Sequence, residues 1–136
     1  MSKADIPFPS HAYVPGQTPR HPDDWFDPLK SDVGLHEDVT CSTAWRAGQV
    51  YLEHGYFWEC HEVLEAVWLH LPNPSPERDM TQAIIQLANA RLKTRMGKPR
   101  ATKRLAGMVL TLLAPHEGEI LGCSVDKLRA TAAGLL

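Results

Sequence analysis

The chain has 136 residues, a length that fits one domain built on one hydrophobic core. Apolar residues make up 43% of it and charged residues 22%, as in an ordinary globular protein and unlike a disordered chain. The formal net charge of -2 argues against a dedicated nucleic-acid binder, which normally has a surplus of basic residues. We therefore expect no nucleic acid among the partners.

The distribution of apolar residues and cysteines predicts a cytoplasmic protein without a membrane anchor. No apolar run approaches the ~20 residues that cross a bilayer. Pro7 and Pro9 interrupt the N-terminal stretch, so it lacks the hydrophobic region of a signal peptide. The 3 cysteines form no Cys-x-x-Cys pair, and Cys60 falls on an apolar helix stripe, which favours a reducing compartment over a disulfide framework.

Residues 1–34 predict an extended N-terminal arm, and residues 35–136 predict a helical domain. The arm holds 6 of the 11 prolines, so we expect neither a helix nor a regular strand there. It also carries large apolar side chains that a disordered tail would lack. We expect the arm to pack either on this domain or on a second subunit, in which case the protein is a homodimer. Tyr13-Val14-Pro15-Gly16 reads as a turn.

Four helices and a short last one follow in chain order, at about 42–54, 56–71, 75–96, 99–113 and 124–133. Ser42 or Thr43 can cap the first of these helices and Ser75 the third, Pro76 suits a first helical position, and Gly55 and Gly97 suit helix ends. Residues 115–122 read as a loop, and no stretch alternates with a period of two over a useful length. The predicted fold is an all-α single-domain bundle of four to five helices with short connections.

The segment Gly55–Trp68 holds the candidate site. Phe57, Cys60, Leu64, Val67 and Leu71 form the apolar stripe of a core-facing helix. A second stripe, Trp58, His61, Glu65 and Trp68, runs beside it at roughly 100° around the helix. His61 and Glu65 stand four residues apart, so their side chains can share a hydrogen bond or a divalent metal ion.

Two known metal motifs fail at these residues. A metalloprotease motif requires a second histidine where this chain has Glu65, and a di-metal bundle requires paired Glu-x-x-His motifs. His61 and Glu65 are only two metal ligands, and His21 of the arm is the candidate third. Trp58, Glu62, Trp68 and Gln82 are the candidate ligand-binding residues around the pair.

Three functions stay open from these residues. The first is a metal-binding or small-ligand-binding protein. The second is a structural or protein-interaction module in which His61 and Glu65 form a buried polar network, completed by Gln82. The third is hydrolase or isomerase chemistry with Glu65 or Glu62 as general base and His61 as acid, although the sequence contains no nucleophile motif, phosphate loop or cofactor fingerprint. No reaction is named by the sequence, and the interaction module is slightly favoured.

The same segment resembles a known family, the domain of unknown function 309 family. His61, Glu65 and Trp68 fit that family's His-x-x-x-Glu-x-x-Trp hallmark within a Gly-aromatic-aromatic-Glu-x-His-Glu context. Residues 82–88 and 96–99 are similar as well, and residues 13–22 look like the N-terminal extension of one branch of the family. The resemblance implies an all-helical fold, no established activity, and a suggested metal role for His61 and Glu65 with Trp68 as packing partner.

Overall fold

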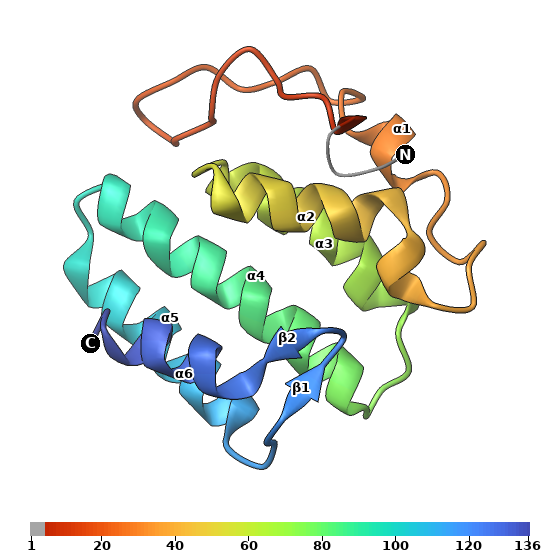
Figure 1. The fold of residues 1–136 in the computed structure, drawn as a ribbon. Coiled ribbons are helices and arrows are strands. Elements are labelled where there is room, and N and C mark those ends of the chain that lie inside the picture. Colours follow the sequence, from red (N-terminus) through yellow and green to blue (C-terminus); the bar gives the residue numbers. More distant parts are fainter. Residues whose placement is uncertain (1–4) are drawn as a thin grey trace. The chain divides into compact units, whose positions relative to one another are not determined.

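The computed structural model describes residues 5–136. Within that range the chain is mainly helical, which confirms the predicted all-α class. The described residues fall into two compact units, residues 5–70 and residues 71–136, whose helices and strands are labelled in Figure 1. The helices of the first unit are α1 (Asp27–Lys30), the 3-10 helix η2 (Val39–Cys41), α2 (Thr43–Glu53) and α3 (Phe57–His70). The second unit contains α4 (Pro76–Arg95), α5 (Pro99–Leu113), β1 (Glu119–Ile120), β2 (Cys123–Ser124) and α6 (Val125–Ala133).

In the first unit α2 packs against α3. Ser42 caps α2 by accepting a hydrogen bond from the Trp45 N–H, and Gly55 follows the helix with a φ of 81°, both as predicted. The two helices approach closely at Gly48, where an added Cβ would lie 2.4 Å from Cδ2 of Leu64. Leu64 is fully buried, so glycine at position 48 is a packing requirement of this helix pair.

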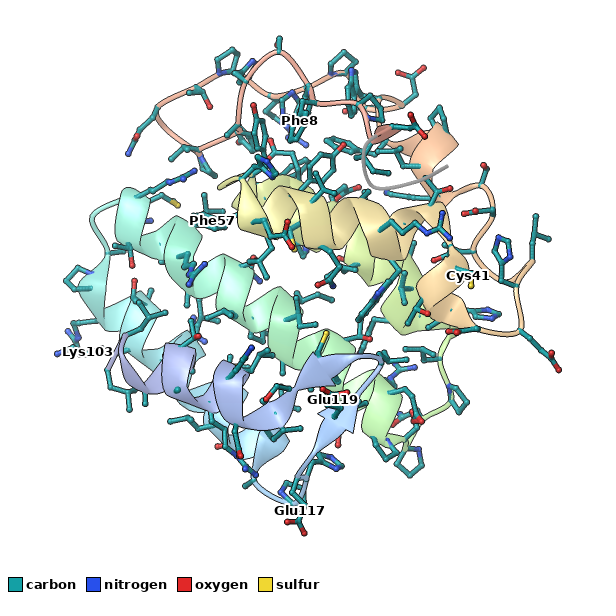
Figure 2. The ribbon with its side chains drawn as sticks, viewed as in Figure 1. Phe8, Cys41, Phe57, Lys103, Glu117 and Glu119 are labelled. Carbon is teal, nitrogen blue, oxygen red and sulfur yellow. The ribbon has the colours of Figure 1, made fainter. Side chains whose placement is uncertain are left out.

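Residues 6–26 of the arm run without a helix or strand and contact α2 and α3. The Tyr51 hydroxyl of α2 donates a hydrogen bond of 2.7 Å to the carbonyl of Pro7. Phe8, labelled in Figure 2, packs edge-on against Tyr51 and His54 and at a tilt against Tyr56, with ring centroids 5.1 to 5.9 Å apart. These contacts occur within one chain.

Two details of the arm differ from the sequence prediction. The turn spans Val14 to Gln17, one residue later than predicted, because the Gln17 N–H bonds the Val14 carbonyl and Gly16 takes a φ of 82°. The expectation of no helix in residues 1–34 is wrong at α1, a single turn that begins after Phe26 with Pro28 in its first turn. Proline is compatible with that position because the first N–H groups of a helix need no intrahelical acceptor.

In the second unit α4 packs against α5, and α6 packs against α5. Ser75 caps α4 through the Arg78 N–H, with Pro76 at the first position, as predicted. The hydroxyl of Thr102 on α5 donates to the Ala90 carbonyl of α4 at 3.1 Å and so joins the two helices. Met80, Ile84, Val109 and Leu113 are among the buried side chains of this unit.

The predicted loop at residues 115–122 contains the start of a short antiparallel hairpin. Glu119 pairs with Ser124 and Ile120 with Cys123, and the tight turn places Leu121 and Gly122 at φ values of 53° and 74°. Strands of two residues are too short to show a period of two, so the sequence pattern could not reveal them. Over the described residues, none of the helices is both long enough and apolar enough to cross a bilayer.

Candidate functional site at the arm and α3

The predicted pair on α3, His61 and Glu65, does meet. Nε2 of His61 lies 3.0 Å from a carboxylate oxygen of Glu65, as four-residue spacing on a helix allows. The His61 side chain is 27% exposed and that of Glu65 is 52% exposed. Glu65 is therefore not part of a buried network, whereas Nδ1 of His61 is buried and has no hydrogen-bond partner among the described residues.

The buried carboxylate of α3 is Glu59, which is 0% exposed. Its Oε2 accepts a hydrogen bond of 2.7 Å from the Tyr13 backbone N–H and lies 2.6 Å from Nε2 of His21. Both partners belong to the arm, so one oxygen of α3 fixes the arm at two points. The His21 side chain is itself only 3% exposed. Sequence reasoning grouped His21 with His61 and Glu65, whereas its partner in the structure is Glu59.

Aromatic rings surround the His21–Glu59 pair and shield it from water. The Trp58 indole lies 5.2 Å from the Tyr13 ring, 5.8 Å from the Phe26 ring and 6.1 Å from the His21 ring, between centroids. Edge-to-face packing of this kind stabilises aromatic pairs beyond the area they bury. A hydrogen bond inside such an enclosure is stronger than one in water, and it costs more to disrupt.

Glu59 also affects two neighbouring groups. Burial, together with the Glu59 charge and the nearby Tyr56, raises the pKa of the Tyr51 hydroxyl well above its usual range. Burial and the same carboxylate raise the pKa of the Cys60 thiol, which is fully enclosed. A thiol held protonated is a poor nucleophile and a poor metal ligand. Cys60 is therefore a core residue, as its place on the apolar stripe predicts.

A small polar pocket lies between the arm and α3, beside the buried pair. Its volume is about 110 Å³. The residues that line this arm pocket are Arg20, His21, Pro22, Asp23, Phe26, Trp58 and Glu62. The structure thus brings His21, which the sequence nominated as a metal ligand, together with Trp58 and Glu62, which it nominated as ligand-binding residues. Arg20 and Asp23 were missed, since their only signal in the sequence is that they flank His21 and Pro22.

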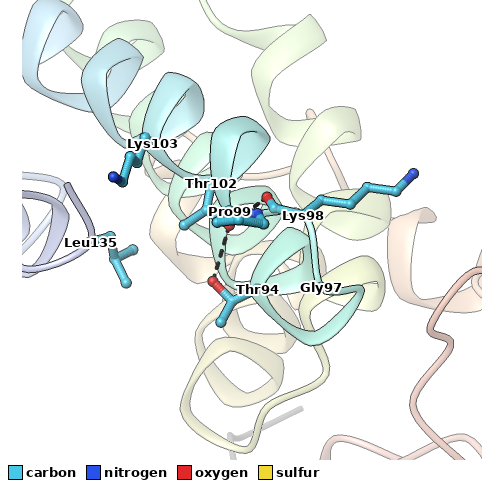
Figure 3. A pocket seen from close by; sticks show the side chains of 7 residues that line it. All are labelled: Thr94, Gly97, Lys98, Pro99, Thr102, Lys103 and Leu135. Atoms are coloured by element: carbon cyan, nitrogen blue, oxygen red, sulfur yellow. Dashed lines mark hydrogen bonds between the residues drawn. The ribbon is translucent and has the colours of Figure 1, made fainter.

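The other two nominated ligand residues lie elsewhere. Trp68 stands on the last turns of α3 and does not line the arm pocket. Gln82 lies on α4 in the second unit, where it borders a pocket of about 450 Å³ with Arg104, Met108 and Leu112 of α5. A further pocket of about 300 Å³ opens where α4 meets α5, lined by Thr94, Lys98, Thr102 and Lys103 among others (Figure 3). None of the nominated residues belongs to it.

A metal site at His61 and Glu65 lacks further protein ligands. In the part of the chain that the structure describes, no group of three or more histidine, cysteine, aspartate or glutamate side chains could hold a metal ion. Zinc sites in proteins usually have three or four protein ligands. His21, the proposed third ligand, is held by Glu59 instead.

Comparison with known proteins supports the family resemblance. The family model described as "Domain of unknown function (DUF309)" matches residues 45–105, which confirms the resemblance drawn from the motif. The matched segment covers most of α2, all of α3 and α4 and the first half of α5. It includes Trp58 and Glu62 of the arm pocket and leaves Arg20, His21 and Asp23 outside. No curated protein and no solved structure matches the chain.

Proposed function

We propose that this chain, with its DUF309 segment, is a binding domain that holds a small polar ligand in the arm pocket. The observation that supports this proposal is the convergence of Trp58 and Glu62 of α3 with His21 of the arm on one cavity. An aromatic wall with a few fixed polar groups is the usual composition of a small-molecule site. The formal net charge of -2 favours a small molecule over nucleic acid as the ligand.

The pocket is preorganised by the buried pair behind it. Glu59 holds the His21 imidazole at 2.6 Å and the Tyr13 backbone at 2.7 Å, so the arm's side of the pocket is fixed before a ligand enters. On the other side, the Lys30 ammonium lies 2.8 Å from Glu62 and orients its carboxylate. Groups already held in place lose little conformational entropy on binding.

A divalent metal ion at His61 and Glu65 is the less favoured form of the same function. The two side chains supply one nitrogen and one carboxylate on an exposed helix face, and solvent or the ligand would have to complete the coordination shell. We therefore expect weak, substoichiometric binding. Metal analysis of protein purified without an affinity tag checks this expectation. Stoichiometric metal whose removal by a chelator lowers the unfolding temperature would contradict it.

The proposed function is tested by ligand-observed NMR. The panel contains acetate, methylammonium, inorganic phosphate and small amino acids, each added to the full chain. We expect at least one compound to bind, and Glu62→Gln to weaken that binding because it removes a carboxylate from the pocket wall. Gln82→Ala is the matched control, since Gln82 does not line the arm pocket. The proposal is refuted if binding weakens in Gln82→Ala and not in Glu62→Gln, or if no compound binds.

A protein-interaction module is the second candidate, with the arm in contact with a second subunit. The observation that favours it is the exposure of three large apolar side chains in the first unit, Phe8 at 43%, Leu35 at 77% and Leu69 at 64%. Light scattering of the full chain and of a variant that lacks residues 1–34 tests this candidate. It predicts a dimer that becomes a monomer on deletion, and an identical subunit number for both proteins would contradict it.

A further inference from the structure

The ionisable groups that line the arm pocket differ in whether they already have a partner. Glu62 is paired with Lys30 at 2.8 Å, and His21 is paired with Glu59 at 2.6 Å. Each of these two lining groups therefore has a compensating charge or hydrogen bond within the protein. A ligand gains less from the charge of such groups than from an unpaired charge, because the protein partner already satisfies part of it.

Two charged groups of the pocket have no such partner. Arg20 and Asp23 both line the cavity, and across residues 5–136 no ion pair joins either side chain to another residue or to each other. One carries a positive charge and the other a negative charge. The pocket therefore offers a ligand one unpaired cation and one unpaired anion on opposite ends of the short Arg20–Asp23 segment.

We propose that the ligand of the arm pocket is a small zwitterion, an α-amino acid with a side chain no larger than a methyl group. This inference rests on the proposed function. The ligand carboxylate would pair with the Arg20 guanidinium, which is suited to two parallel hydrogen bonds with a carboxylate. The ligand ammonium would pair with Asp23. A ligand with a single charge satisfies only one of the two groups.

The size of the cavity supports the same class of ligand. The volume of the arm pocket is about 110 Å³, well below the roughly 300–1,000 Å³ of sites for drug-sized ligands. Glycine or alanine suits such a space, whereas a longer side chain would have to project past the exposed Arg20 and Asp23 into solvent. Selectivity for the smallest amino acids follows from this limit.

The test is isothermal titration of the full chain with glycine and L-alanine, with acetate, methylammonium and L-phenylalanine as comparison ligands. We expect glycine and alanine to bind at least tenfold more tightly than any of the three comparison ligands. Arg20→Gln and Asp23→Asn should each weaken glycine binding at least tenfold. Asp24→Asn is the matched control, because Asp24 is the adjacent exposed carboxylate and does not line the pocket.

The outcomes separate this inference from the function on which it rests. Binding of acetate or methylammonium as tight as that of glycine, or glycine binding that is insensitive to both Arg20→Gln and Asp23→Asn, overturns the zwitterion inference. If such binding still weakens in Glu62→Gln, the arm pocket remains the binding site. If no compound of either panel binds the wild-type chain, both proposals fail together. The far-ultraviolet circular dichroism of each variant shows whether it is folded.

Discussion

Replacing Glu59 with glutamine tests whether the buried pair holds the arm on α3. The substitution keeps the size of the side chain and removes its charge. In the wild-type chain one oxygen of Glu59 accepts hydrogen bonds from the Tyr13 N–H and from His21. A hydrogen bond to a charged group contributes about 1.5–3 kcal/mol and one to a neutral group about 0.5–1.5, so two weakened bonds cost about 2–3 kcal/mol.

Glu65→Gln is the matched control on the same helix. Glu65 faces His61 at 3.0 Å, but its side chain is 52% exposed, and exposed ion pairs contribute little to stability. We expect the free energy of unfolding to change by less than about 0.5 kcal/mol in this variant. The two substitutions are chemically identical, so any difference between them reports the environments of the two carboxylates.

The assay is urea unfolding followed by tryptophan fluorescence. All 4 tryptophans, Trp25, Trp45, Trp58 and Trp68, lie in the first unit, so the signal reports the part of the chain that contains Glu59. The buried-pair explanation requires Glu59→Gln to lose clearly more stability than Glu65→Gln. Equal losses, or a loss below about 0.5 kcal/mol for Glu59→Gln, would show that the arm is not held by this carboxylate.

Two further substitutions test the packing and the charge pattern of the first unit. Gly48→Ala should cost about 1–3 kcal/mol, because the new Cβ would lie 2.4 Å from the buried Leu64 side chain; wild-type stability in the urea assay would refute this packing. Asp32 has a lowered pKa: burial opposes the shift, but hydrogen bonds from the backbone and side chain of Thr43 outweigh it, with His36 adding to them. The Asp32 contribution to stability is therefore present above the ordinary pKa of 3.8 and is lost as the pH falls through the lower folded value. Asp32→Asn should make the unfolding temperature less dependent on pH between about pH 5 and pH 2. A variant whose unfolding temperature falls with pH as steeply as that of the wild-type chain would contradict this reasoning.

The sequence predicted the helices closely because their ends carry local signals. Ser42, Ser75 and Pro76 at helix starts and Gly55 at a helix end all act within a few residues, so no tertiary information was needed. The predicted helix at residues 99–113 has the bounds of α5. The hairpin at Glu119–Ser124 and the single turn of α1 could not be predicted, because elements this short have no measurable period.

The site was harder to predict because its groups come from distant parts of the chain. His61 and Glu65 attracted attention since they are neighbours on one helix, yet the buried carboxylate is Glu59, whose partner His21 lies 38 residues away. A local signal did exist. Glu59, Val63 and Val67 follow one another at four-residue steps, and all three are fully buried, so Glu59 is a charge on an apolar stripe. Such a position demands a partner that the pattern cannot identify.

The central claim is that the pocket between the arm and α3 is the binding site of this chain. Chemical-shift mapping by ¹H–¹⁵N NMR during a glycine titration tests it most directly. We predict that the perturbed signals are the backbone amides of Arg20, His21 and Asp23, the indole N–H of Trp58 and the amide of Glu62, which line or flank the pocket. Perturbations confined to residues around Gln82 and α5, or no perturbation at saturating glycine, would contradict the claim.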